Sequence, residues 1–228
     1  VTSSLSALGD EELGNGKDKN SSIKHALESV CDTDWAGCEK SRKSTSCCHE
    51  YLDGNMVFGY SRNQKGVSLS STESEYYGAS SGCSEGLFLK SIQEFISGEG
   101  SVNMVCRLDN SAARQLVLRS GVSKIRHIEA RMLWLQDKAK SKAFSVAGIS
   151  TVWNTADLGT KGLTGERINM LLYMVGVVDA ENGFKPVGEK EFERETEKQA
   201  SKKMIRSICE SLAEGTSRTI MNPDNVKL

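Results

Sequence analysis

Three short apolar segments joined by turns place the strongest constraint on how this chain folds. They are SVCDTDWA (29–36), TSCCHEYLD (45–53) and NMVFGYS (55–61), and Asp53 with Gly54 makes the turn that joins the last two. An Asp-Gly turn between two apolar runs is a strong hairpin signal. The beginning of the domain is therefore predicted to be three consecutive strands, each antiparallel to the next.

The rest of the domain alternates between helix and strand patterns. Helical periodicity runs from Ser71 to about Ile96, and the apolar segments VNMVCRLD (102–109) and AFSVAGI (143–149) read as strands. Strands that alternate with helices usually run parallel. The sequence therefore predicts an α/β fold: a mixed five-stranded sheet, with three antiparallel and then two parallel strands, flanked by helices.

Composition divides the chain into three parts. Residues 1–27 are rich in Ser, Gly, Asn and charged residues and are predicted to form a flexible linker. Residues 28–176 hold the apolar segments and are predicted to form one domain. Residues 177–228 are charge-laced with few apolar anchors, which predicts a C-terminal tail that is helical or disordered. Since the first residue is Val, we expect a piece of a longer protein.

Charge and cysteine content narrow the functional classes. The net charge of −1 excludes a global positive field, so a nucleic-acid partner would need a local basic patch. No apolar run of membrane-spanning length occurs, which predicts no membrane partner. The seven cysteines have irregular spacing without a Cys-x-x-Cys pair, so we expect free thiols and an intracellular, cytoplasmic location.

Four acidic residues occupy informative positions in the predicted fold. Asp32 lies in the first strand, Glu75 early in the first long helix, Asp109 at the end of the fourth strand, and Asp157 at a helix start. Clustered carboxylates repel one another unless cations neutralise them, and Mg²⁺ prefers such oxygen ligands. The structural alternatives to metal binding are a hydrated strand edge for Asp32, an N-cap for Asp109 and a helix-dipole contact for Asp157.

The stretch LSSTESEYYGAS (69–80) holds two carboxylates with different expected roles. Ser70-x-x-Glu73 and Thr72-x-x-Glu75 both fit a capping box. Glu75 shares a helix face with small residues that allow close packing on a sheet. We therefore expect Glu73 to cap the helix and Glu75 to point at Asp32. The small residues of this face are Ala79, Gly82, Cys83 and Gly86.

Five motifs follow one another along the chain: DTDWAGCEKSRKSTS, SLSSTESEYYGAS, LDNSAARQLV, KIRHIEARMLWLQDK and NTADLGTKGL. In this order they resemble the ribonuclease H domain of copia-type LTR retrotransposon Pol polyproteins. The resemblance covers about residues 28–176. It implies a ribonuclease H fold and metal-dependent cleavage of the RNA strand of RNA–DNA hybrids, with two Mg²⁺ ions, or Mn²⁺ in their place. The family's catalytic and metal-binding carboxylates fall on Asp32, Glu75, Asp109 and Asp157.

The partners implied are an RNA–DNA hybrid and a reverse transcriptase domain in the same polyprotein, with virus-like particles as a further location. The alternatives are a decayed nucleic-acid-binding remnant and another nuclease of the same fold. A cation pair with neighbouring hydroxyls suits contacts to a nucleic-acid backbone without reading of bases, although a solvated turn would have the same composition. The predicted hybrid-binding residues are Arg42, Lys43, Ser44, Thr45, Asn110 and Ser111.

Overall fold

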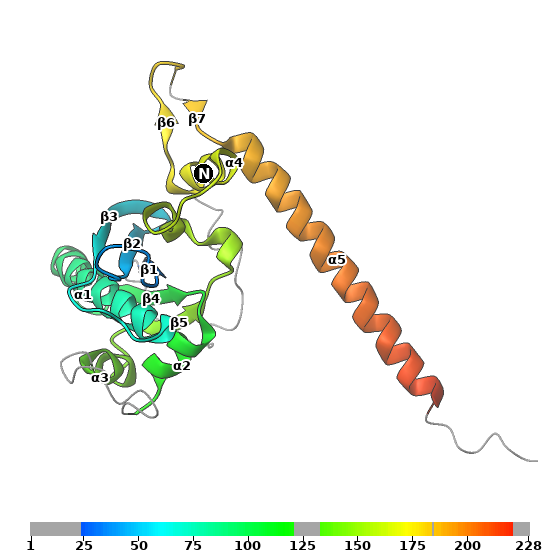
Figure 1. Cartoon of the computed structure of the whole chain (residues 1–228), viewed down its shortest axis with the longest axis horizontal. Coiled ribbons are helices and arrows are strands. Elements are labelled where there is room, and N and C mark those ends of the chain that lie inside the picture. Colours follow the sequence, from blue (N-terminus) through cyan, green and yellow to red (C-terminus); the bar gives the residue numbers. More distant parts are fainter. Residues whose placement is uncertain (1–23, 121–132, 184, 221–228) are drawn as a thin grey trace, which may run out of the picture.

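A mixed five-stranded sheet forms the centre of the computed structural model, which describes residues 24–120, 133–183 and 185–220 (Figure 1). Its order is β3-β2-β1-β4-β5; β1, β2 and β3 are antiparallel, and β4 and β5 run parallel to β1. The predicted fold class is confirmed. The strands are β1 (His25–Asp34), β2 (Thr45–Leu52), β3 (Asn55–Asn63), β4 (Val102–Leu108) and β5 (Ser145–Gly148).

The hairpin between β2 and β3 turns at Asp53 and Gly54, as the sequence predicts. Both residues have positive φ, 50° and 80°, which a two-residue type I′ turn requires. The Asp53 carboxylate also accepts a hydrogen bond from the backbone N–H of Ala26 at 2.8 Å and lies 2.7 Å from the ring of His25. The turn residue therefore also ties the hairpin to the beginning of β1.

Helix α1 (Ser71–Ser97) lies close against the sheet through the predicted face of small residues. Ala79, Gly82, Cys83 and Gly86 are all buried. A Cβ atom added at Gly82 would come within 2.4 Å of the Cys31 Sγ, so only glycine allows this approach. The small face fixes the distance between α1 and β1, and with it the distance between their acidic side chains.

The two faces of the sheet are covered by different elements. On one face, α1 packs with α2 (Ser111–Leu118) and α3 (Trp134–Lys140) around the main apolar core. A smaller cluster that includes Val30 and Ala156 covers the other face, where the 3₁₀ helices η3 (Thr151–Trp153) and η4 (Thr155–Gly159) lie. Since neighbouring residues of a strand face opposite sides, Val30 and Asp32 lie toward η4 and Cys31 toward α1.

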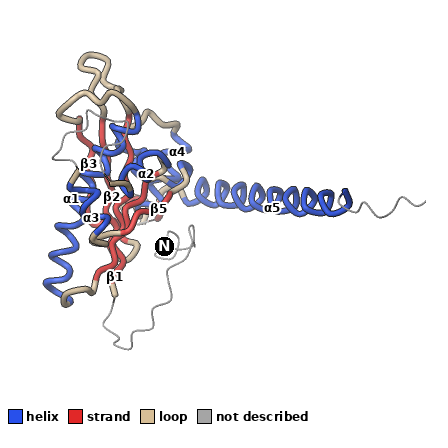
Figure 2. The backbone as a smooth tube through the Cα atoms, turned by 90° about the horizontal axis from the view of Figure 1, so that it is seen from below, coloured by secondary structure: helices blue, strands red, loops and turns tan. Residues whose placement is uncertain are grey.

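The C-terminal elements continue beyond the sheet. Helix α4 (Gly165–Val175) leads to the strand pair β6 (Val178–Asp179) and β7 (Lys185–Pro186), and then to α5 (Glu189–Ile220). Helix α5 extends away from the body (Figure 2); it lies in the segment expected to be a helical or disordered tail, which also contains β6 and β7. Near its beginning, Phe192 packs against Trp153 and Tyr173, with ring centroids 5.7 and 4.8 Å apart.

The domain boundaries stay predictions. Strand β1 begins at His25, inside the segment predicted as a linker, and residues 1–23 of that segment lie outside the described residues. None of the helices in the described part is both long and apolar enough to cross a membrane.

Candidate metal centre

Asp32 and Asp109 are neighbours because both follow the last residue pair of the parallel β1–β4 ladder. Cys31 pairs with Leu108 at the end of this ladder, so Asp32 and Asp109 each come directly after that pair, while β1 continues to Asp34 along β2. Ligand sites of α/β sheets form at the carboxyl ends of parallel strands. The strand register thus brings together two carboxylates that are far apart in the sequence.

The Asp32 side chain is only 1% exposed and is held from the side of η4. The Thr160 hydroxyl donates to one carboxylate oxygen, and Lys161 Nζ lies 3.1 Å from the other. Burial raises the pKa of Asp32 to about 6, although Thr160 and Lys161 act in the opposite direction. The carboxyl is therefore costly to ionise despite its partners.

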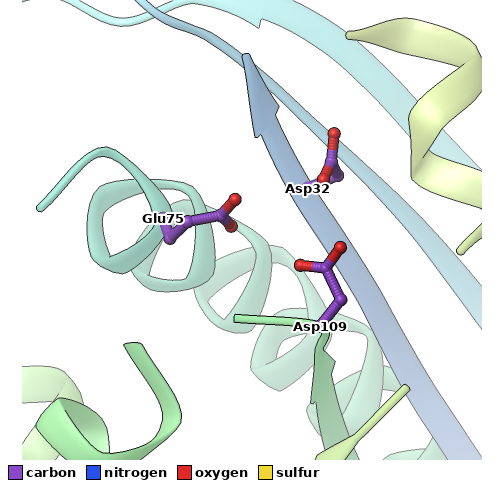
Figure 3. A group of neighbouring side chains, drawn as sticks. All are labelled: Asp32, Glu75 and Asp109. Carbon is purple, nitrogen blue, oxygen red and sulfur yellow. The ribbon is translucent and has the colours of Figure 1, made fainter. Parts of the chain in front are cut away.

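Helix α1 separates the roles of its two glutamates as predicted. Ser70 is the N-cap, and its side chain accepts from the backbone N–H of Glu73 at 3.2 Å. Glu73 in turn accepts from the N–H of Leu69 at 2.7 Å, one residue before the usual capping-box partner. Glu73 is therefore part of the cap. Glu75, one half-turn further on, points toward Asp32 and Asp109 (Figure 3).

Glu75 is a buried carboxyl that faces two other acidic side chains. The residue is 7% exposed, and its Oε2 atom has no hydrogen-bond partner among the described residues. Burial, followed by the nearby charges of Asp32 and Asp109, raises the pKa of Glu75 to about 8. A buried polar atom without a partner is costly, which indicates that a ligand completes this environment.

Asp109 completes the group from the end of β4. Thr151 donates its hydroxyl to Asp109 Oδ2 at 3.2 Å. The N-cap of α2 is Asn110, whose side chain accepts from Ala113, so Asp109 is left free of the capping role considered for it. One oxygen from each of Asp32, Glu75 and Asp109 lies within 4.8 Å of the others (Figure 3).

This donor set fits a hard divalent cation. Three carboxylates offer only oxygen ligands, which Mg²⁺ and Mn²⁺ accept, and no thiol or imidazole belongs to the group. Burial, followed by the charges of Asp32 and Asp109, raises the pKa of Glu75, and a bound cation would favour its ionised form. The Oε2 atom of Glu75, which has no hydrogen-bond partner among the described residues, is available to bind a metal ion. The residues present therefore fit the metal that the sequence implies.

Asp157 is not brought into this group of three. It is buried, and it forms ion pairs with Lys161 at 2.7 Å and with Arg167 at 3.2 Å. Lys161 also contacts Asp32, so the ammonium lies between the two aspartates. Although burial opposes its charge, Asp157 and Asp32 raise the pKa of Lys161 above its usual range. Asp157 thus lies next to the group of three carboxylates, with Lys161 between it and Asp32.

Several residues of this region were not singled out from the sequence. Asn154 caps η4, and its side-chain amide donates to the Cys31 carbonyl at 3.4 Å. Arg167 binds the Asp157 carboxylate and the Thr151 carbonyl. The one usable signal was the spacing of Asp157 and Lys161, since side chains four residues apart meet on a helical turn.

The predicted hybrid-binding residues have mixed environments. Arg42 is exposed, with a positive φ of 53°, and Lys43 is half-buried beside it. Ser44 is buried and accepts from the N–H of Ala36, while Thr45 donates to Asn63. Both hydroxyls thus make internal contacts. Asn110 caps α2 and is half-buried, and Ser111 is exposed.

The sheet order, the strand directions and the covering helices define a ribonuclease H-like fold that carries a carboxylate group at its parallel strand ends. In sequence, the chain is 29% identical over 152 residues to the "Retrovirus-related Pol polyprotein from transposon TNT 1-94" of Nicotiana tabacum, covering 66% of this chain and 11% of the relative. The corresponding polyprotein from transposon RE2 of Arabidopsis thaliana is 29% identical over 154 residues, with 67% and 11% covered.

The chain therefore has retrotransposon Pol polyproteins as homologues, as the resemblance predicts, and it spans about a tenth of their length. Among solved structures, it is similar to the N-terminal RNase H domain of a Mycobacterium tuberculosis protein, with a TM-score of 0.39, 12% identity, and 59% of this chain and 90% of that chain covered. It is also similar to LC11-RNase H1 in complex with an RNA/DNA hybrid, with a TM-score of 0.36, 10% identity, and 60% and 93% covered. No protein-family model matches.

Proposed function

We propose that this chain is a metal-dependent ribonuclease H that cleaves the RNA strand of RNA–DNA hybrids during reverse transcription of a copia-type retrotransposon. The observation that carries the proposal is the convergence of Asp32, Glu75 and Asp109, two of them just beyond the end of the parallel β1–β4 ladder and one on the facing helix. The relationship to Pol polyproteins supports the biological setting.

The carboxylates would hold the metal ions and keep them at fixed positions. Two bound Mg²⁺ ions, or Mn²⁺, supply a nucleophilic water of lowered pKa and stabilise the leaving oxygen in phosphodiester hydrolysis. Asp32, Glu75 and Asp109 would be the ligands of the first ion, and Asp157 would contribute to the second position. All four are proposed as catalytic residues.

Neighbouring residues orient these ligands. Thr160 fixes one oxygen of Asp32, and Thr151 fixes one oxygen of Asp109. The close contact of α1 with β1 keeps Glu75 facing both aspartates. Since packing holds Glu75 and hydrogen bonds hold Asp32 and Asp109, these three ligands need to move little when the first metal ion binds.

Contacts with the hybrid would come from groups that bind the backbone. Arg42 and Lys43 stand in the turn after β1, where their charges can approach phosphates, and Ser111 is exposed at the beginning of α2. Ser44, Thr45 and Asn110 are also proposed to contact the hybrid, through their backbone groups or after their side chains leave the internal hydrogen bonds. Such contacts recognise hybrid shape and 2′-hydroxyls rather than sequence. A reverse transcriptase domain in the same polyprotein and a cytoplasmic location, within virus-like particles, complete the proposal.

The test is a substrate panel with end-labelled strands. The wild-type chain should cleave only the RNA strand of the hybrid in Mg²⁺, leaving 5′-phosphate and 3′-hydroxyl ends, and should leave duplex DNA and four-way junctions intact. Glu75→Gln and Asp109→Asn should lose cleavage while remaining folded, whereas Glu73→Gln should retain it.

The other outcomes distinguish the alternatives. Hybrid binding without cleavage in Mg²⁺ or Mn²⁺ would identify a decayed nucleic-acid-binding remnant. Cleavage of duplex DNA or junctions would identify another nuclease of this fold. Hybrid cleavage that survives Asp109→Asn would remove Asp109 from the machinery.

A further inference from the structure

Lys161 holds two buried carboxylates of the site at once. Its Nζ lies 2.7 Å from Asp157 Oδ1 and 3.1 Å from Asp32 Oδ1. These aspartates come from elements far apart in the chain, and their side chains are 4% and 1% exposed, so neither is screened by water. The lysine therefore joins β1 to η4 across the acidic site.

The position of this ammonium is set by the backbone. The N–H of Lys161 donates to the Asp157 carbonyl at 3.1 Å, closing one turn, and the adjacent Thr160 donates its hydroxyl to Asp32. Lysine and Asp157 are thus four residues apart on the same turn, the spacing at which their side chains meet. The contact between Lys161 and Asp157 therefore follows from the local geometry of this turn.

Charge is distributed unevenly around the four carboxylates. Asp157 has two cationic partners, Lys161 and Arg167, and Asp32 has one. No ion pair with Glu75 or Asp109 is present among the described residues. The negative charges of Glu75 and Asp109 are therefore the least compensated, and a cation is most favourable beside them. The charges of Asp32 and Asp157 are already balanced by Lys161 and Arg167.

An ammonium in this place excludes a divalent ion shared by the two aspartates. Mg²⁺ binds carboxylate oxygens at about 2.1 Å, so an ion that bridged Asp32 and Asp157 would need the space that Nζ occupies. The lysine side chain is 36% exposed, which leaves a route for its flexible end to swing toward solvent.

We propose that Lys161 acts as a built-in counter-cation for the second metal position: the free protein binds one divalent ion at Asp32, Glu75 and Asp109, and a second ion binds between Asp32 and Asp157 only by displacing Lys161. This inference rests on the proposed metal-dependent function and adds an order and an affinity difference to it. The first ion binds tightly, and the second binds only at higher metal concentration.

The test is Mn²⁺ binding to the free protein, measured by electron paramagnetic resonance and calorimetry without nucleic acid. The wild-type chain should show one tight ion and a much weaker second. Lys161→Met should strengthen the second step by roughly tenfold or more, since a unit charge within about 4 Å repels the ion strongly at a buried site. Lys90→Met removes another i,i+4 lysine, paired with Glu94, and should change neither step.

A second variant keeps the proposal testable if Lys161→Met does not fold. Lys161→Arg retains the charge, and its planar fork holds carboxylates more firmly, so it should weaken the second Mn²⁺ step below the wild-type affinity. Equal second-step affinities in the wild type and in either variant would overturn the inference.

The inference and the proposed function fail in different ways. Two-step Mn²⁺ binding that responds to Lys161, in a chain that never cleaves a hybrid, would refute the nuclease function alone. Hybrid cleavage by a chain in which Lys161→Met leaves Mn²⁺ binding unchanged would refute the lysine's role alone.

Discussion

Replacing Glu75 by glutamine should change how the metal-free protein responds to pH. Burial and the charges of Asp32 and Asp109 raise the pKa of Glu75 from an ordinary 4.5 to about 8. The folded state therefore holds this proton more tightly than the unfolded state does. Its stabilising contribution is fully present below about pH 4.5 and is lost as the pH rises through about 8.

The size of the effect follows from that window. Each pH unit within it lowers the free energy of unfolding by up to about 1.4 kcal/mol. Between about pH 5 and pH 8, the loss is on the order of 4 kcal/mol for the wild type. Glu75→Gln carries no ionisable group at this position and should lack this loss.

The assay is urea unfolding in a chelating buffer at several pH values. Near pH 5 the wild type and Glu75→Gln should have similar stability, and by pH 8 the variant should be the more stable of the two. Glu73→Gln is the matched control, since it alters a cap outside the carboxylate group. It should cost about 0.5–1 kcal/mol at every pH. Parallel curves for the wild type and Glu75→Gln would refute the electrostatic reasoning.

Three further changes test buried groups of the sheet and of the helix that packs on it. Glu50 is fully buried with a pKa raised by burial to about 7, so Glu50→Gln should weaken the decline in stability between about pH 4.5 and 7, seen in the same urea series. Gly82→Ala should lower the free energy of unfolding by about 1–3 kcal/mol, since its Cβ would meet Cys31 Sγ; a neutral result would contradict the close packing. Tyr51→Phe removes a buried 2.8 Å hydrogen bond to Thr155 and should cost about 1 kcal/mol, and an unchanged midpoint would show that the bond is not needed.

Most of the fold follows from local signals in the sequence. The Asp53-Gly54 turn determines the hairpin, and Ser70 and Glu73 mark the beginning of α1. Small residues at Gly82 and Gly86 indicate which face of that helix meets the sheet. These signals act over a few residues, so they can be seen without knowing the rest of the structure.

The candidate site is only partly visible in the sequence. The position of Asp109 at a strand end and the direction of Glu75 on its helix face follow from the sequence pattern, whereas Asp32 and Asp109 were placed in one site by the family resemblance. Asp157 was expected with them, but its ion pairs depend on Lys161 in the loop after η4 and on Arg167 in α4. Likewise, the internal hydrogen bond of Ser44 depends on the loop that follows β1. Such contacts depend on tertiary geometry, which pattern and spacing do not contain.

Anomalous diffraction from crystals grown with Mn²⁺ would test the central claim most directly. The account predicts a strong peak in contact with Asp32, Glu75 and Asp109, with Lys161 still between Asp32 and Asp157 at low Mn²⁺ concentration. Crystals in which the three carboxylates remain together without a peak at saturating Mn²⁺ would contradict it.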